Sequence, residues 1–552
     1  MQLIDRRLGL IFCGFLLLFS VALARAAWLQ GVRGGELRAD ARTQQVTAIP
    51  VPGERGRVLD RTGTVLAVSE DAATVIATPY QVKNPEQTAQ RLAEVLPVTR
   101  GEIEDALSDR DSGFAYVAKK VSLDESDAVD ELQIHGISTL PDSRRIYPQG
   151  ELAAQVIGSV NDENDGLTGL EQALDDTVGG ENGEQEVVHD ARGEPIRFDT
   201  LTEATTGEDV RLTIDAAIQA RAEEAIAAAG EAYSAAGASA VVMDPDTNDV
   251  LAMANWPGFD PYDPGDASDE QLLNRTTGFT YEPGSTFKAF TVAAAVEEGL
   301  VSPETSFYLP PTIKVADRVI EEAHERPPIH ATVAEILAQS SNVGAVKVGM
   351  EVGAERFDEW VRRFGFGEPT GVGFPGEEQG ILLDVDDYSG STMGNMPLGQ
   401  GLSVTPMQMA TAYAAIANGG ILRNPRLISQ AAGEARPRDI EGTRVLSPAT
   451  ASQLRSMLEG VVAAGGTASE VEVPGYELAG KTGTAEKAVD GGYSETDYVA
   501  SFVGFAPARD PELLVAVIVD EPMYEHSGGV VAAPVFGDIA EFALPYLGIS
   551  PG

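Results

Sequence analysis

Cysteine is almost absent from this chain, since Cys13 is the single one among 552 residues. One cysteine excludes an intramolecular disulfide framework and a metal site built from cysteine ligands. Motifs for binding a metal ion or a nucleotide are lacking as well, so we expect no metal and no cofactor. With 43% hydrophobic and 22% charged residues the composition is that of an ordinary folded protein, long enough for about two to four domains with full cores.

Positive charge is also scarce, because 85 acidic residues outnumber 39 lysines and arginines and give a formal net charge of -46. Proteins that bind nucleic acid regardless of its sequence need Lys and Arg to displace counterions from phosphates. We therefore expect no nucleic acid among the partners of this protein.

Lysine is rarer than arginine in this chain. Its eight lysines stand at positions 83, 119, 120, 288, 314, 347, 481 and 487. Arginine keeps its proton at any accessible pH, whereas a desolvated lysine can lose it. We therefore interpret Lys288, within the stretch YEPGSTFKAF, as a position that needs an amine able to become neutral.

The N-terminus carries the clearest topological signal. Arg6 and Arg7 precede seventeen residues without a charge, which is near the lower limit for a membrane-spanning helix. Flanking arginines on this side favour a cytoplasmic N-terminus. We therefore predict a cytoplasmic tail at residues 1–7 and a single transmembrane anchor in the cell membrane at 8–27. The sequence ALA at 22–24 resembles a cleavage site, so a removed signal peptide stays an alternative, and in both cases the remaining chain lies outside the cytoplasm.

Residues 28–208 are predicted to form a mixed α/β module that carries no nucleophile arrangement. It would begin with a polar, membrane-proximal helix or stalk from Trp28 to about Pro50. Turn residues and hydrophobic periodicity predict its further elements. These are a hairpin at 54–69 with Gly63 at the turn, helices at Pro85–Leu96 and Ser122–Leu132, and a strand-turn-strand unit with its turn at 191–193.

Residues 209–552 are predicted to form a second domain, after a boundary near 205–215. Helical and strand-like runs of different period occur together here and indicate an α+β fold. The predicted elements are a helix at Ala216–Ala229, a hairpin at 238–255, helical runs at Thr291–Val296 and Val333–Leu337, and two late strands in SFVGFAP and ELLVAVIVDEP.

Ser285 and Lys288 are three residues apart at the predicted start of a helix, which places them on one face within hydrogen-bond reach. A hydroxyl is a poor nucleophile until a base takes its proton, and a neutral lysine can be that base. The backbone N–H groups at a helix N-terminus favour a developing oxyanion. A serine cap beside a surface lysine is the alternative for an isolated motif of this kind.

Two further motifs follow in the chain. Ser340-Ser341-Asn342 lies between two helical runs, where a hydroxyl and an amide can relay a proton from Lys288 and hold a substrate carbonyl; alone, the motif also fits a helix-capping loop. The third motif is Lys481-Thr482-Gly483-Thr484, next to a strand. It can offer an ammonium and hydroxyls to a substrate carboxylate, and the N–H of Thr484 can complete an oxyanion hole with that of Ser285. An edge strand guarded by a lysine is the alternative.

The three motifs together are far more specific than each alone. With the blocks around them, the sequence resembles the class B penicillin-binding proteins, the monofunctional peptidoglycan transpeptidases, whose signatures are S-x-x-K, S-x-N and K-T-G. The supporting blocks, in chain order, are ERGRVLDRTGTVLA, RRIYPQGELAAQVIG, GLEQALDD, LTIDAAIQ, YEPGSTFK, SSNVG, LGQGLSVTPMQMATAYAAIANGG, AGKTGTAEK and YVASFVGFAPARDP.

The resemblance implies a bitopic protein with an N-terminal transmembrane helix, an elongated pedestal domain and a C-terminal transpeptidase domain of helices packed on an antiparallel sheet. Ser285 would attack the penultimate D-Ala carbonyl of a stem peptide, and an amine of a neighbouring stem would then take the acyl group. The implied roles are Lys288 as base, Ser340 and Asn342 as relay and positioning groups, and Lys481, Thr482, Gly483 and Thr484 as carboxylate clamp and oxyanion hole. β-Lactams would acylate Ser285.

The resemblance extends to a subtype. The block YVASFVGFAPARDPELLVAVIVDEP, followed by GGVVAAPVF, is similar to the septal, cell-division branch rather than the elongation branch. Partners of that branch are a SEDS-family glycosyltransferase and other divisome membrane proteins, with lipid-linked nascent glycan as substrate. Two residues depart from the family pattern: Thr62 stands where Asn is frequent, and Glu486 stands where Gln is common, which leaves the acceptor preference open.

Other functions remain as alternatives at this stage. A Ser-His-Asp hydrolase fits poorly, because no G-x-S-x-G surrounds Ser285 and the histidines at 135, 189, 324, 330 and 526 are interpreted as surface or capping residues. A β-lactamase or D,D-carboxypeptidase would differ by letting water deacylate the enzyme. A non-enzymatic β-lactam sensor or divisome scaffold is the third alternative.

Overall fold

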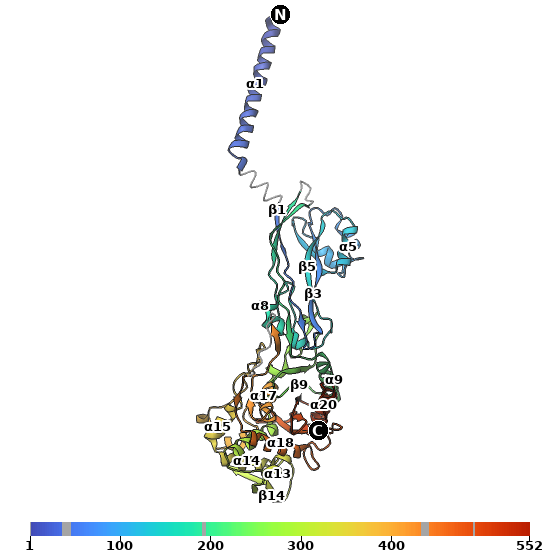
Figure 1. The fold of residues 1–552 in the computed structure, drawn as a ribbon. Coiled ribbons are helices and arrows are strands. Elements are labelled where there is room, and N and C mark those ends of the chain that lie inside the picture. The colour runs from blue at the N-terminus through green and yellow to red at the C-terminus, as the bar shows by residue number, and fades with distance from the viewer. Residues whose placement is uncertain (1, 36–45, 190–194, 432–440, 490–491, 552) are drawn as a thin grey trace. The chain divides into compact units, whose positions relative to one another are not determined.

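The computed structural model describes residues 2–35, 46–189, 195–431, 441–489 and 492–551 (Figure 1). These residues divide into two compact units. The first comprises Met1–Glu54, Asp71–Ser143 and Gly180–Gly207, and the second comprises Arg55–Glu70, Arg144–Gly179 and Glu208–Gly552. The units therefore do not follow a single cut along the chain, because two segments from before residue 208 belong to the second unit.

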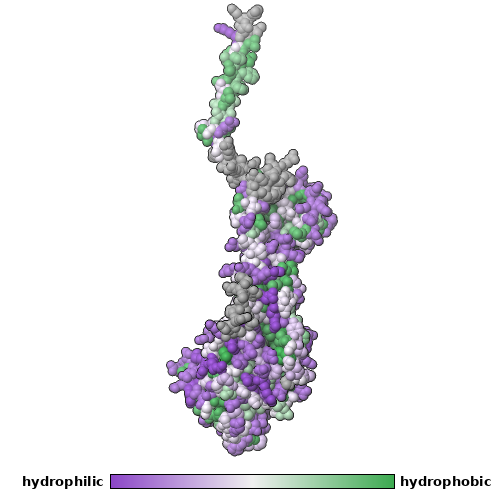
Figure 2. Space-filling model, in the orientation of Figure 1, coloured by the Kyte–Doolittle hydropathy of each residue, from purple (hydrophilic) through white to green (hydrophobic). Residues whose placement is uncertain are grey.

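Helix α1 (Gln2–Gly31) is the candidate membrane span of the first unit. Residues Arg6–Gly31 have a mean hydropathy of 2.2, and none of the apolar window is buried by protein, so apolar side chains surround the helix (Figure 2). Twenty-six residues rise far enough to cross a bilayer. The predicted helix or stalk up to Pro50 is wrong at its end, because Val46–Val51 forms strand β1.

The remainder of the first unit contains an antiparallel three-stranded sheet of order β1-β6-β7, with β6 at Gly183–His189 and β7 at Pro195–Thr202. The two latter strands confirm the predicted strand pair, and its turn at 191–193 lies outside the described residues. A helical layer packs on three strands, the C-terminal part of β3 (Val65–Ala77), β4 (Ala115–Val121) and β5 (Ile137–Ile146). The helices and strands enclose a small core that includes Val75, Leu92 and Ile103. The helices of this layer are α3 (Pro85–Leu92), α4 (Arg100–Ala106) and α5 (Leu123–Glu131).

Helices α3 and α5 confirm the two helices predicted from the sequence, with shorter bounds, whereas α4 was not predicted. Helix α3 ends four residues before the predicted Leu96, and residues 93–95 form a turn instead. Helix α5 begins after Ser122, whose side chain accepts a hydrogen bond from the N–H of Glu125 while Glu125 bonds back. The side chain of Ser122 therefore sets the start of α5, whereas among the described residues no capping side chain bounds α3.

The second unit is built on an antiparallel five-stranded sheet of order β10-β9-β20-β19-β18. Its strands are β9 (Gly237–Met243), β10 (Val250–Trp256), β18 (Ala479–Val489), β19 (Gly492–Ala506) and β20 (Leu513–Asp520). Every residue of β9 and β20 is buried. Since successive side chains point to opposite faces, protein must cover both faces of these central strands. The predicted hairpin and late strands, and the α+β class, are confirmed.

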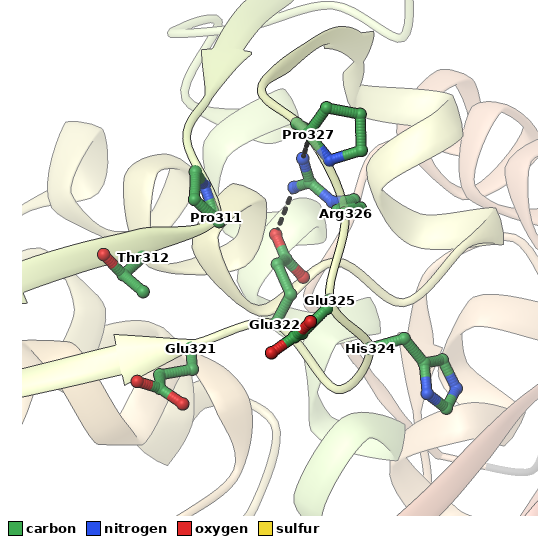
Figure 3. Close-up of a pocket in the computed structure, with 8 residues that line it drawn as sticks. All are labelled: Pro311, Thr312, Glu321, Glu322, His324, Glu325, Arg326 and Pro327. Carbon is green, nitrogen blue, oxygen red and sulfur yellow. Dashed lines mark hydrogen bonds and ion pairs between the residues drawn. The ribbon is translucent and has the colours of Figure 1, made fainter.

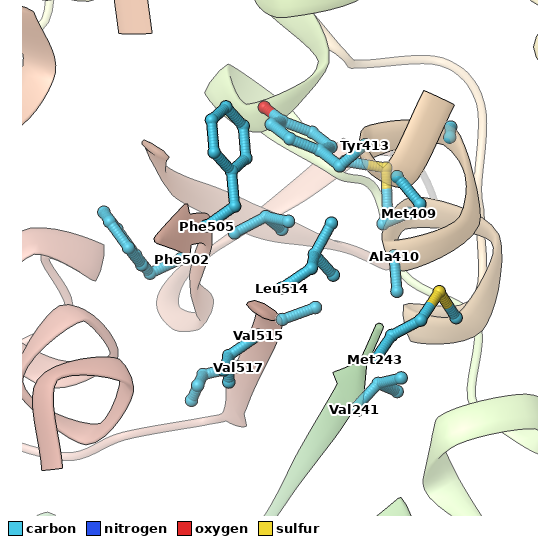
Figure 4. Packing of buried hydrophobic residues seen from close by; sticks show 14 of the residues in the cluster. Val241, Met243, Met409, Ala410, Tyr413, Phe502, Phe505, Leu514, Val515 and Val517 are labelled. Carbon is cyan, nitrogen blue, oxygen red and sulfur yellow. The ribbon is translucent and has the colours of Figure 1, made fainter. Parts of the chain in front are cut away.

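Helices cover this sheet. Helices α9 (Ala216–Ala232) and α20 (Ala533–Tyr546) contact each other and the sheet, while α17 (Pro406–Ala417) packs on β9, β19 and β20. Figure 4 shows Met409 and Tyr413 of α17 beside Met243, Phe505 and Leu514 of the strands. The predicted helix at 216–229 begins where expected, because Asp215 caps it by accepting from the N–H of Ala217.

The early segments of the second unit explain several of the sequence blocks. In the hairpin of β2 (Val58–Leu59) and the start of β3, Gly63 has φ +101°, as predicted. A buried carboxylate, Glu171, accepts from Arg55 Nε at 2.8 Å and from Arg145 Nε at 2.6 Å. Removing one partner of such a buried charge cluster is strongly destabilising. The charges of Arg55, Arg145 and Glu171 therefore hold chain segments of the second unit together.

Candidate active site

Ser285 lies in a tight turn that leads into a buried helix. The turn is the 3₁₀ helix η2 (Gly284–Phe287), and α12 (Lys288–Glu297) continues it. Gly284 has φ +53° and donates its N–H to the carbonyl of Gly399 at 3.0 Å. The hydroxyl of Tyr413 donates to the carbonyl of Thr286 at 2.6 Å. Ser285 itself is half-buried, so this fixed turn presents its hydroxyl at an accessible surface.

Lys288 is buried, with 1% of its surface exposed. Its Nζ donates to the carbonyl of Ser340 at 2.7 Å and to Asn342 Oδ1 at 2.6 Å, and it lies 3.3 Å from Ser340 Oγ. Among the described residues no hydrogen bond joins Lys288 Nζ to Ser285 Oγ, so the direct contact expected from their spacing is not formed. The amine is turned toward the second motif instead, and catalytic hydrogen bonds of this kind tighten when substrate binds.

Burial lowers the pKa of Lys288, as we expected for an amine that must be able to become neutral. Desolvation disfavours the ammonium and lowers the pKa of Lys288 to about 7, although the negative charge of Glu322 acts in the opposite direction. In a large fraction of the protein molecules Lys288 therefore carries a neutral amine near pH 7, whereas an exposed lysine is almost wholly protonated there. The surface-lysine alternative for this motif is excluded by the burial.

The second motif forms the connection between α13 (Val333–Ala338) and α14 (Asn342–Val352). Ser340 has φ +58°, a left-handed conformation that is uncommon for residues other than glycine. This conformation lets both its carbonyl and its hydroxyl face lysine amines. Ser341 caps α14 by accepting from the N–H of Gly344 at 3.0 Å. The capping alternative therefore holds for Ser341, while Ser340 and Asn342 reach Lys288.

The third motif brings a second buried lysine to the same hydroxyl. Lys481 on β18 is 0% exposed, and its Nζ donates to Ser340 Oγ at 3.0 Å. Burial and the neighbouring charge of Lys288 lower the pKa of Lys481 well below its ordinary value. A lysine that protects a sheet edge points into solvent, so that alternative does not describe Lys481. Ser340 thus bridges the two lysines of the site.

The rest of the third motif lies against the serine turn. The hydroxyl of Thr482 is 2.6 Å from that of Thr467, and exposed Thr484 accepts from the N–H of Gly528 at 3.1 Å. A Cβ on Gly483 would lie 2.3 Å from Ser501 Oγ and 3.0 Å from the carbonyl of Pro283, two residues before Ser285. Glycine at position 483 therefore permits the close approach between β18 and the serine turn.

We expect Gly483→Ala to lower the free energy of unfolding by about 1–3 kcal/mol, because the added methyl group overlaps Ser501. It should also slow acylation, since β18 must shift away from the serine turn. Thermal unfolding and acylation by a fluorescent penicillin measure the two effects. Gly492→Ala on β19 is the matched control, as its Cβ would meet open space, and equal effects of both variants would contradict the packing argument.

Two acidic residues, Glu282 and Glu486, lie beside the site, and Glu486 is one of the two positions at which the sequence departs from the family pattern. Glu282 accepts from the N–H of Gly401 at 2.9 Å and from the hydroxyl of Tyr493 at 3.2 Å. Burial and the charge of Glu486 raise the pKa of Glu282. Both carboxylates line a cavity of about 200 Å³ together with Ala485. The charge of Glu486 therefore acts on Glu282, a residue three positions before Ser285 that sequence reasoning had not singled out.

Histidine does not take part in the described site. His135, His324, His330 and His526 are exposed, and His189 is a residue whose side chain is not described. In the described part of the chain, the side-chain hydrogen bonds of Lys288, Ser340 and Lys481 involve no histidine. The observed constellation is thus of the serine–lysine type, not Ser-His-Asp.

Comparison with known proteins agrees with this constellation. The family described as penicillin binding protein transpeptidase domain matches residues 238–541, and that described as penicillin-binding protein dimerisation domain matches 50–212. Stage V sporulation protein D of Bacillus subtilis is 35% identical over 557 residues, covering 97% of this chain and 86% of that protein. Peptidoglycan D,D-transpeptidase FtsI of Escherichia coli is 32% identical over 555 residues, covering 98% and 92%.

A solved structure gives the same result in three dimensions. The crystal structure of penicillin binding protein 3 from Mycobacterium tuberculosis, complexed with aztreonam, has a TM-score of 0.71 and 31% identity, and the match covers 91% of this chain and 98% of that one. All three motifs fall inside the matched transpeptidase range. The chain belongs to the class B penicillin-binding proteins, the family of serine-type peptidoglycan D,D-transpeptidases.

Proposed function

We propose that this protein cross-links peptidoglycan through an acyl-enzyme on Ser285. The observation that carries the proposal is the arrangement of Lys288, Ser340 and Lys481, in which one hydroxyl contacts two buried lysine amines. A neutral Lys288 takes the proton of Ser285 as its oxygen attacks the penultimate D-Ala carbonyl of a donor stem peptide. The N–H groups of Ser285 and Thr484 stabilise the resulting oxyanion.

The leaving step completes acylation. Ser340 passes a proton from Lys288 to the amine of the terminal D-Ala, whose bond to the carbonyl breaks, and the acyl group stays on Ser285. Asn342 keeps its oxygen on Lys288 and holds the substrate amide. The terminal carboxylate binds to Lys481 with the hydroxyls of Thr482 and Thr484, and its negative charge favours the ammonium form of Lys481. That charge in turn disfavours an ammonium at Lys288 and supports its role as base.

Deacylation transfers the acyl group to an acceptor. The amine of a neighbouring stem attacks the ester carbonyl, its proton passes to Lys288, and Ser285 recovers its hydroxyl hydrogen as the ester bond breaks. β-Lactams imitate the donor peptide and acylate the same oxygen. The cavity that contains Glu282 and Glu486 is also lined by Lys487, and its two acidic side chains support an amine on the acceptor side.

Mass spectrometry of the ectodomain with a stem-peptide thioester and a competing amine tests this function. A new amide between donor and amine is the expected product. Hydrolysed donor alone would identify a D,D-carboxypeptidase or β-lactamase-like enzyme, and a stable acyl-enzyme would identify a β-lactam sensor. Recovery of unmodified donor and unmodified protein would contradict serine catalysis altogether.

The proposed cellular role is cross-linking at the division septum. The late block YVASFVGFAPARDP and the similarity to FtsI of Escherichia coli support this role. We propose a SEDS-family glycosyltransferase and other divisome membrane proteins as partners, contacting the anchor and the pedestal at 28–208, with the transpeptidase domain at 209–552. Localisation of a fluorescent fusion tests the role: enrichment at midcell is expected, and uniform lateral labelling would indicate the elongation branch.

We propose that α1 stays in the mature protein, with residues 1–7 in the cytoplasm and the catalytic domain outside. Arg6 and Arg7 precede the apolar run, which supports this orientation. Cells should therefore retain full-length protein, including Cys13, in the membrane fraction. N-terminal sequencing of the purified protein is the measurement, and a mature N-terminus at Arg25 would show that the segment is a cleaved signal.

A further inference from the structure

Glu322 is a buried carboxylate next to the site that no sequence motif marks. It follows directly on β13 (Arg318–Glu321), the second strand of a hairpin with β12 (Thr312–Val315), and its side chain is 7% exposed. Its Oε1 accepts from the hydroxyl of Ser341 at 2.6 Å, and its Oε2 accepts from the N–H of Asn342 at 2.9 Å. Both oxygens are thus bonded to the second motif.

The same hairpin also orients the amide of Asn342. The carbonyl of Glu321 accepts from Asn342 Nδ2 at 2.8 Å. Because an amide donates through nitrogen and accepts through oxygen, this bond turns Oδ1 of Asn342 toward Lys288, which donates to it at 2.6 Å. The hairpin end therefore determines which atom of Asn342 the catalytic amine meets.

Ser340 needs such support, because its φ of +58° is unfavourable for a residue with a side chain. A backbone conformation of this kind costs about 1–3 kcal/mol and persists only where surrounding structure enforces it. Glu322 bonds the two residues that follow Ser340 directly. These hydrogen bonds therefore stabilise the turn in which the Ser340 oxygens face Lys288.

Arg326 completes the arrangement. Its guanidinium forms an ion pair with Glu322 and donates to the carbonyl of Leu309 at 3.1 Å. Figure 3 shows Glu322 pointing toward Arg326 inside a pocket that is also lined by Glu325 and His324. Charged hydrogen bonds of this type are shorter and stronger than neutral ones, so Arg326 helps to hold the Glu322 carboxylate, whose Oε1 also accepts from Ser341.

We propose that Glu322 is a positioning residue of this active site: its carboxylate holds Ser341 and Asn342 so that Ser340 and Asn342 present their oxygens to Lys288. The inference rests on the proposed acylation of Ser285. Within the described residues Glu322 forms no hydrogen bond to Ser285 or Lys288, and it acts on the reaction through the loop and through its charge.

The charge of Glu322 supplies a readout that loop packing alone would not move. Two charged groups lie near the Lys288 amine: Lys481, on β18, and Glu322, which follows β13. Arg326 in turn forms an ion pair with Glu322. A negative charge favours the ammonium of Lys288. The acylation rate should rise with pH as Lys288 loses its proton, and we call this rise the acidic limb. Removing the negative charge of Glu322 should therefore move the acidic limb to lower pH, whereas removing the positive charge of Arg326 should move it to higher pH.

Acylation kinetics of the ectodomain with a β-lactam, measured across pH, test the proposal. We expect Glu322→Gln to lower the rate above the acidic limb by about 10- to 100-fold, because the relay atoms are misplaced, and to shift the limb down by about 0.5 to 1 pH unit. Glu322→Asp keeps the charge and should leave the limb in place while restoring part of the rate. Arg326→Gln should shift the limb in the opposite direction.

Glu325→Gln is the matched control, because Glu325 lines the same pocket and is exposed. It should acylate like wild type. A wild-type rate and limb in Glu322→Gln, or equal losses in the control, would overturn the proposal. A loss with an unshifted limb in both Glu322→Gln and Arg326→Gln would also overturn it. If Glu322→Gln does not fold, the test uses the other two variants: the acidic limb should stay in place in Glu322→Asp and should move to higher pH in Arg326→Gln. Failure of the wild type to acylate would instead refute the proposed function.

Discussion

Ser285→Ala is expected to abolish covalent labelling by a fluorescent penicillin. Acylation needs an oxygen that can form an ester with the ring-opened lactam, and alanine has none. Thermal unfolding should stay close to wild type, since within the described residues the hydroxyl of Ser285 makes no hydrogen bond that folding would lose. Gel fluorescence after incubation with the label measures the first effect, and a thermal melt measures the second.

A serine change elsewhere in the same unit provides the control for this experiment. Ser302 is exposed and lies after α12, so Ser302→Ala should label like wild type. If folded Ser285→Ala were labelled undiminished, the nucleophile would have to be another residue. The proposed acyl-enzyme on Ser285 would then be wrong, although family membership would stand.

Lys288→Arg is expected to be nearly as damaging as Lys288→Ala. Guanidinium keeps a positive charge but does not accept a proton, and a lost general base typically lowers a rate by about 10²- to 10⁴-fold. Lys481→Arg should slow acylation less, because a carboxylate clamp needs charge and donors, which arginine supplies at some geometric cost. Stopped-flow acylation by a β-lactam separates these cases, and a near wild-type rate in Lys288→Arg would show that position 288 supplies charge instead of basicity.

The pH dependence gives an independent check on Lys288. Its pKa is lowered to about 7, and the neutral form is the proposed base. Wild-type acylation should therefore rise as pH increases through about 7 and level off once the amine is deprotonated. The residual activity of Lys288→Ala should lack this rise. A wild-type rate that stays constant from pH 6 to about 9 would contradict a titrating amine at this position.

The three motifs could be found from sequence because their chemistry restricts each position to one or two residue types at short spacing. Spacing alone, however, predicted that Lys288 would meet Ser285, and the amine instead bonds Ser340 and Asn342, more than fifty residues further along the chain. Local periodicity does not contain such long-range contacts. The same limit hid Glu322, whose partners are determined by how a hairpin packs on a loop.

The fold was predicted best where hydrophobic patterns are long and local. The hairpin at 238–255 and the helix that begins at Ala216 are examples, since alternation and capping residues specify them without reference to distant segments. The segments Arg55–Glu70 and Arg144–Gly179 are counterexamples, because they join a compact unit formed mainly by residues after 208. Arg55 and Glu171 join these two segments to each other, and β2 pairs with β8 (Val210–Leu212) of the later chain; no local pattern predicts either contact.

Strand β18 is the last strand of its sheet, and among the described residues only β19 pairs with it. A strand in this situation has backbone N–H and C=O groups that its sheet leaves unused, and an extended peptide can bind to them as one more strand. Recognition of that kind reads the ligand's main chain and tolerates changes in its side chains. Discrimination between donor peptides would then depend on the carboxylate at the peptide's end and on the handedness of its residues, not on pockets for particular side chains.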